Sequence, residues 1–194
     1  MSAIIVPLQG FAVDGEKWIK DARLEEIASA TGLPLQMYKG NRRNWPSALR
    51  GDKRLWRAVA KAFEEWLDGR YCFLLGHSDG ASMAVRLAIT LRSRVRGVCC
   101  YAGMHRAFSR HENLSGEKWP PALFMVNSHD QTPAGGNVQL IYKDWNGPKL
   151  LQVHDNPGWT TWLESHEWKP DFANPPCITF IQEIEALLAG RSLA

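Results

Sequence analysis

The sequence predicts an α/β fold, in which helices cover both faces of a mostly parallel sheet of about six strands in a three-layer sandwich. The main observation is that short apolar runs alternate with longer stretches whose apolar residues recur at helical spacing. This alternation is typical of βα units on a parallel sheet. In addition, the run at 71–75 is apolar on both faces, as a central parallel strand is.

The first half of the chain provides three of the predicted strands. The run at 3–8 stops before Gly10 and is followed by a charged stretch, 14–31, which we expect to form a helix ending at Gly32. Pro34 then opens a short second strand, 34–38. Residues 41–51 are rich in Arg, Pro and Gly and favour a loop. An apolar stripe over 52–69 predicts a second helix, directly before the strand at 71–75.

The second half repeats the pattern. Apolar residues between Ala84 and Leu91 have the spacing of a helix packed on the sheet. Strands are predicted at 95–101, 122–126 and 149–153, and helices at 138–145 and 177–188. Because no repeat, linker or low-complexity segment interrupts the pattern, we expect residues 1–194 to form one domain.

Charge and composition exclude several functional classes. The 23 Lys and Arg residues against 20 Asp and Glu leave a net charge of +3, which does not require a nucleic-acid partner. The sequence has no apolar stretch of about 18 residues and no signal-peptide pattern at its N-terminus, so we expect no membrane span and a cytoplasmic location. The four cysteines form no C-x-x-C pair, which favours buried, reduced thiols.

A G-x-S-x-G motif follows the strand at 71–75 and precedes a predicted helix. Its residues are Gly76-His77-Ser78-Asp79-Gly80. A serine in a sharp strand-to-helix turn needs glycines two positions before and after it, because the flanking backbones pass very close. The helix start behind the serine favours developing negative charge. Ser78 is therefore the candidate nucleophile; the alternative is a purely structural βα turn.

A serine nucleophile needs a base and a group that orients the base, and in this fold both follow it in the chain. Asp130 comes directly after the strand at 122–126, at the sheet edge where ligands gather, although it could instead cap a helix or turn. Two histidines compete as the base. His154 ends the last strand and His166 lies in the following loop, a position that favours His166 because a loop residue reaches over the sheet more easily.

On these motifs the chain resembles the α/β-hydrolases. Residues 76–80 match the nucleophile elbow of that family, and 121–130 match its strand ending in Gly-x-x-Asp, with Asn127 in place of glycine. His166-Glu167-Trp168 is similar to the His-x-Trp of some esterases. The resemblance implies a reduced α/β-hydrolase fold without its two N-terminal strands. It also implies an oxyanion hole made by the N–H groups of Phe11 and Asp79, with Gln9 where the family usually has histidine.

Together these residues predict a serine hydrolase that cleaves a small-molecule ester through Ser78, His166 and Asp130. The same triad is compatible with a thioesterase, an amidase or peptidase, or an acyltransferase. A catalytically silent binding protein with this fold is the alternative from another class. Because 104–121 is too short for a cap domain, we expect an open site.

Neither a metal nor a cofactor is expected. The histidines at 105, 111 and 129 do not have a metal-ligand spacing with nearby acids, and no strand is followed by a nucleotide-binding glycine motif. Nine tryptophans are unusual, and three of them, Trp159, Trp162 and Trp168, cluster around His166. They are candidate substrate-binding residues; alternatively, they pin a long loop to the body of the protein.

Overall fold

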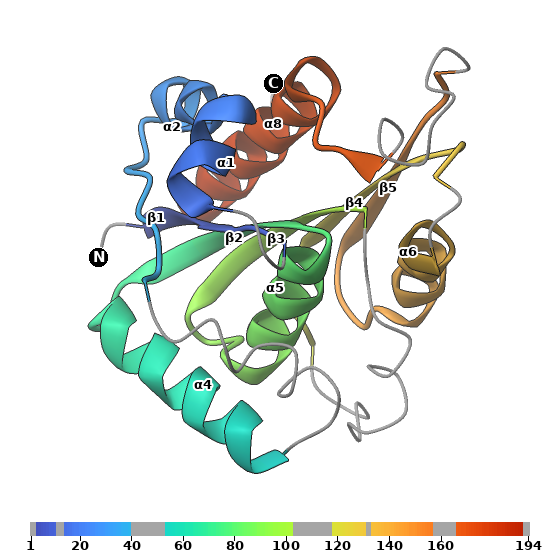
Figure 1. Ribbon diagram of the computed structural model, residues 1–194. Coiled ribbons are helices and arrows are strands. Elements are labelled where there is room, and N and C mark those ends of the chain that lie inside the picture. Colours follow the sequence, from blue (N-terminus) through green and yellow to red (C-terminus); the bar gives the residue numbers. More distant parts are fainter. Residues whose placement is uncertain are drawn as a thin grey trace.

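A five-stranded, fully parallel sheet forms the centre of the protein in a computed structural model, which describes residues 3–10, 14–39, 53–102, 118–130, 133–156 and 166–191 (Figure 1). The strands lie side by side in chain order: β1 (Ala3–Leu8), β2 (Tyr71–His77), β3 (Val95–Tyr101), β4 (Ala122–Asn127) and β5 (Lys149–His154). Since all strands run the same way, the five carboxyl ends meet at one edge. The predicted α/β class is confirmed.

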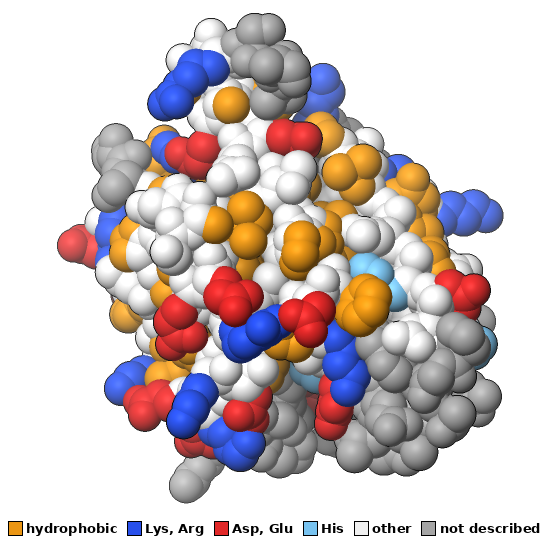
Figure 2. Space-filling view, turned by 90° about the horizontal axis from the view of Figure 1, so that it is seen from above, with side chains coloured by type: hydrophobic (Ala, Val, Ile, Leu, Met, Phe, Trp, Pro, Cys, Tyr) orange, Lys and Arg blue, Asp and Glu red, His pale blue; other side chains and the backbone are white. Residues whose placement is uncertain are grey.

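Six helices of the described part cover the two faces of the sheet (Figure 1). One face carries α1 (Gly15–Asp21), α2 (Leu24–Thr31) and α8 (Pro170–Leu188). The other face carries α4 (Lys53–Leu67), α5 (Asp79–Thr90) and α6 (Pro133–Asp144). The surface over α1, α2 and α8 has acidic and basic side chains next to one another (Figure 2). The ion pairs Lys17–Asp21 and Arg23–Asp171 belong to these helices and the turn between them.

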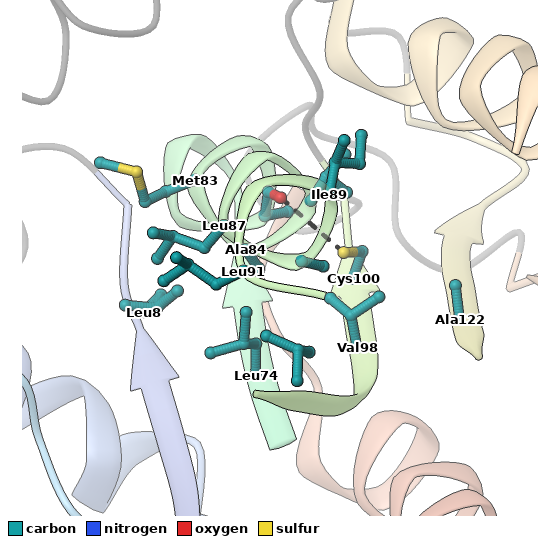
Figure 3. Close-up of a cluster of buried hydrophobic side chains, with 14 of the residues drawn as sticks. Leu8, Leu74, Met83, Ala84, Leu87, Ile89, Leu91, Val98, Cys100 and Ala122 are labelled. Carbon is teal, nitrogen blue, oxygen red and sulfur yellow. Dashed lines mark hydrogen bonds between the residues drawn. The ribbon is translucent and has the colours of Figure 1, made fainter. Parts of the chain in front are cut away.

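The core is built from side chains that alternate between the two faces of the strands, as a buried parallel sheet requires. On the α5 side, Leu8, Leu74 and Val98 from three neighbouring strands pack against Leu87 and its neighbours on the helix (Figure 3). The Cys100 thiol donates to the Ala81 carbonyl at 3.7 Å. All four cysteines are buried, free thiols. This packing fixes the start of α5 directly behind the carboxyl end of β2.

The predicted sixth strand at 34–38 does not form. Only Leu35 pairs with the sheet, through a single parallel bridge to Ile5, in which the Gln36 N–H donates to the Ile5 carbonyl at 2.8 Å. Pro34, which has no N–H, accepts at its carbonyl from the Ile5 N–H at 2.9 Å. The sheet in the described part therefore has five strands, one fewer than predicted.

The predicted helix at 14–31 is two helices. The chain breaks at Arg23, whose φ of 47° is left-handed. The amide nitrogen of Asn174 in α8 donates to the carbonyl oxygens of both Ala22 and Arg23 at 3.1 Å, so a tertiary contact satisfies the backbone carbonyls at the break. The helix predicted at 177–188 begins earlier, at Pro170, and contains Pro175 and Pro176. In the described part, no helix is long and apolar enough to cross a membrane.

Candidate active site

Ser78 occupies a strained turn between β2 and α5. Its φ of 55° and ψ of −125° lie in a region that non-glycine residues rarely adopt. The Ser78 N–H points toward the next strand and lies 2.7 Å from the Ala102 carbonyl and 3.1 Å from that of Tyr101. Such strain persists only where the surrounding structure holds the residue in place, and it is found mainly at functional sites.

The glycines of the motif permit this turn because backbone segments pass against them. A Cβ at Gly80 would lie 1.8 Å from the Leu8 carbonyl oxygen, and a Cβ at Gly76 would lie 2.5 Å from the Ala81 Cα. These distances are far below van der Waals contact, so neither position accepts a side chain unless the backbone moves. The spacing of the two glycines around Ser78 therefore reflects close backbone approaches, as the motif predicts.

His166 lies between Ser78 and Asp130. Its Nε2 is 3.0 Å from the Ser78 Oγ, and its Nδ1 is 3.1 Å from the Asp130 Oδ2. A carboxylate only accepts hydrogen bonds, so Nδ1 carries the proton and donates it, and Nε2 of the neutral ring accepts from the Ser78 hydroxyl. The His166 side chain is 14% exposed and that of Asp130 0% exposed. The buried carboxylate fixes the tautomer in which Nε2 is free to accept a proton.

A tight turn after β4 positions Asp130. The Asp130 N–H donates to the Asn127 carbonyl at 3.0 Å, and the Asn127 side-chain oxygen accepts from the His129 N–H at 2.8 Å. Asn127 thus closes the turn at the position where the resembled family has glycine. Strand β3 separates β2 from β4, so Ser78 and Asp130 stand two strands apart and the ring of His166 spans the distance between them.

His154, the second candidate base, has a different environment. Its ring packs against Tyr101 and Phe172, with centroids 6.3 and 5.6 Å away, and burial lowers its pKa. Its Nε2 is buried without a hydrogen-bond partner in the described part of the chain. The imidazole next to Ser78 and Asp130 is that of His166.

One of the two predicted oxyanion donors lies within the described residues. Asp79 is the first residue of α5 and follows Ser78 directly, where a helix has amides without intrahelical partners. Phe11 lies outside the described residues. Gly10 comes just before it, and a Cβ on Gly10 would lie 3.2 Å from the Ser78 Cβ, so the chain leading to Phe11 passes beside the serine.

Of the three candidate substrate-binding tryptophans, Trp159 and Trp162 lie outside the described residues. Trp168 is 6% exposed and belongs to the core on the α8 side. Its ring meets Trp18 edge-on at 5.8 Å, and its N–H donates to the Asn174 oxygen at 2.9 Å. These contacts favour the alternative that Trp168 pins the segment after His166 to the body of the protein. Contact of these tryptophans with a substrate stays a prediction.

A second polar cluster, formed by Ser128, His129 and Asp155, lies exposed near the ends of β4 and β5. The Ser128 hydroxyl and the His129 Nε2 both contact Asp155 Oδ1, at 2.7 and 3.0 Å. The hydrogen bond from Ser128, followed by that from His129, lowers the pKa of Asp155. Serine and histidine share one acceptor here, so His129 does not take the position of a base toward Ser128. Across the described ranges, no three His, Cys, Asp or Glu side chains are arranged to hold a metal.

Sequence reasoning gave no role to His77, although the residue stands inside the motif. The structure places its Nε2 2.7 Å from the backbone oxygen of His166 and its ring against Trp18 and Tyr101. Nothing in the spacing of the sequence brings residues 18, 77, 101 and 166 together. The available signal was the position of a histidine directly before the candidate nucleophile.

Comparison with known proteins supports the fold. No protein-family model matches the sequence, and no curated protein matches it significantly. Among solved structures, a predicted CIB-like hydrolase from Thermoplasma acidophilum superposes with a TM-score of 0.67 at 16% identity, over 94% of this chain and 86% of the other. Esterase PE8 superposes with a TM-score of 0.63 at 15% identity, over 94% of this chain and 92% of the other. An S-formylglutathione hydrolase from Agrobacterium tumefaciens superposes with a TM-score of 0.61 at 15% identity, over 98% of this chain and 84% of the other. The chain therefore has the α/β-hydrolase fold.

Proposed function

We propose that the protein is a serine hydrolase that cleaves a carboxylic ester of a small molecule, with Ser78 as nucleophile, His166 as general base and Asp130 as the group that orients the base. The observation that carries the proposal is the hydrogen-bonded chain from Ser78 Oγ to His166 Nε2, and from His166 Nδ1 to Asp130, at 3.0 and 3.1 Å. The strained turn at Ser78 and the fold shared with esterase PE8 add support.

The reaction has two halves. In the first, Ser78 Oγ attacks the acyl carbon as His166 Nε2 takes the hydroxyl proton, and the same nitrogen then returns that proton to the departing alcohol. In the second, a water attacks the acyl-enzyme while His166 takes a proton from it, and the proton returns to Ser78 as the acid leaves. Asp130 stays ionised and stabilises the imidazolium that forms in each half.

The tetrahedral intermediate carries a negative oxygen that needs hydrogen-bond donors. We assign this role to the backbone N–H groups of Asp79 and Phe11. Asp79 opens α5, so its amide points out of a helix start, whose partial positive charge favours the oxyanion. The proximity of Gly10 to Ser78 supports the place given to Phe11, the next residue.

A fluorophosphonate probe tests the proposal. Ser78 Oγ should displace fluoride from phosphorus and add one probe per chain, with the hydroxyl proton passing to His166. Trypsin releases residues 71–86 as one peptide that contains both Ser78 and Ser82, so fragmentation within it must place the adduct. Ser78→Ala should remain unlabelled, and Ser93→Ala, an exposed serine next to the start of β3, should label like the wild type. A native protein that the probe leaves unmodified would instead support the silent binding protein.

A further inference from the structure

The side chain of His77 makes a hydrogen bond to the backbone of the proposed base. Its Nε2 lies 2.7 Å from the carbonyl oxygen of His166. A carbonyl only accepts, so His77 carries its hydrogen on Nε2 and donates it. The remaining ring nitrogen, Nδ1, is buried and has no hydrogen-bond partner among the described residues. This arrangement defines one tautomer of His77.

Aromatic neighbours from two other elements hold the ring of His77 in place. Trp18 of α1 stacks on it with an interplanar angle of 14° and a centroid distance of 6.2 Å. Tyr101, the last residue of β3, lies 6.0 Å away and is itself fully buried. A stacked ring loses little further side-chain freedom when it makes a hydrogen bond, so the donor of His77 is preorganised toward His166.

We propose that His77 is a positioning residue for the proposed hydrolase reaction: by donating to the His166 carbonyl, it fixes the backbone that carries the base. The inference rests on the proposed function. Two consecutive residues then contact His166 at its side chain and at its backbone. The Ser78 Oγ lies 3.0 Å from the imidazole Nε2, and the His77 Nε2 lies 2.7 Å from the backbone oxygen. The turn that presents the nucleophile thereby also sets the distance from nucleophile to base.

The surroundings of His77 keep its ring neutral. Burial is the main cause that lowers its pKa to about 4, and the nearby ring of His166 acts in the same direction. The hydrogen bond to the His166 carbonyl and the carboxylates of Glu167 and Asp130 act against it. A neutral His77 places no second positive charge beside His166 when that ring becomes an imidazolium, so the contact can orient the base without opposing its protonation.

A second anchor acts on the same segment from the other side. Two residues after His166, Trp168 is buried against Trp18, and its N–H bonds to Asn174 of α8. Trp18 therefore contacts both the ring of His77 and the ring of Trp168. Because Trp18 packs against both His77 and Trp168, the main chain around His166 is restrained both by the turn before α5 and by α8.

Two substitutions separate the donor of His77 from its ring. His77→Phe keeps an aromatic ring against Trp18 and removes the donor. His77→Gln removes the ring, but its amide nitrogen is as many bonds from Cα as the Nε2 of histidine and can donate to the same carbonyl. With p-nitrophenyl acetate, we expect His77→Phe to lower kcat by about 10²-fold with little change in KM, as a misplaced base does. His77→Gln should recover most of that loss.

Several results would overturn the role of His77. A folded His77→Phe with wild-type kcat, or a His77→Gln slower than His77→Phe, would show that the donor does not matter. Melting temperatures of both variants establish that they are folded. Independently of either variant, ring ¹⁵N shifts of the wild type should show His77 protonated at Nε2, and protonation at Nδ1 would contradict the contact. If Ser78 does not react with the fluorophosphonate, the proposed function fails; if it reacts and His77→Phe is fully active, only this inference fails.

Discussion

His166→Ala should lower kcat for an activated short-chain ester by about 10⁶-fold, the loss seen when a serine hydrolase loses its base, whereas His154→Ala should keep most of the wild-type kcat. The reason is that the ring of His166 contacts both Ser78 and Asp130, and without it the Ser78 hydroxyl has no group placed to take its proton. His154 instead packs its ring against Tyr101 and Phe172. Steady-state kinetics with p-nitrophenyl acetate on both variants makes the comparison.

The stability of the two variants provides the control. His154 is buried, so His154→Ala should lower the melting temperature, and the assays belong at a temperature where both variants are folded. If His154→Ala alone abolished acylation, the base would be His154 and the assignment of His166 would be wrong.

Asp130→Asn should lower kcat by about 10⁴-fold and leave KM nearly unchanged. An asparagine amide in the place of the carboxylate can donate to Nδ1 of His166, which favours the tautomer whose hydrogen sits on Nε2. That nitrogen then faces Ser78 with a proton already bound and cannot act as the base. The stabilisation of the imidazolium by the buried carboxylate is lost as well.

Asp155→Asn is the matched control for this substitution. Like Asp130, Asp155 contacts a histidine ring nitrogen, here that of His129, and it also accepts from the Ser128 hydroxyl on the exposed rim beside the site. The same change of side chain there should leave kcat within about twofold, because the proposed mechanism gives this cluster no role. An active Asp130→Asn enzyme would move the orienting acid elsewhere in the chain.

The parallel sheet and the positions of its strands in the chain followed from local patterns in the sequence. Apolar runs predicted all five strands, and the G-x-S-x-G motif placed Ser78 at the end of β2 before the helix α5. These features depend on residues adjacent in the chain. The predicted strand at 34–38 does not form, because it pairs with β1 through only one bridge, at Leu35. Whether such a bridge extends into a ladder depends on tertiary contacts, which the apolar pattern does not contain.

The arrangement around His166 required contacts distant in sequence. Position in the chain favoured His166 over His154, but a distance to Ser78, 88 residues away, could not be read from spacing. The same holds for Asn174, whose amide donates to backbone carbonyls at the break between α1 and α2, and for the stacking of Trp18 on His77. These contacts join segments that are far apart in the chain, so local sequence patterns do not contain them.

The most direct test of the account is the turnover of p-nitrophenyl acetate by the wild type, Ser78→Ala and Ser93→Ala, measured side by side on folded protein. We predict that the wild type and Ser93→Ala hydrolyse the ester with the same kcat, and that Ser78→Ala falls to the level of the buffer. Equal hydrolysis by Ser78→Ala and the wild type would contradict the claim that Ser78 is the nucleophile.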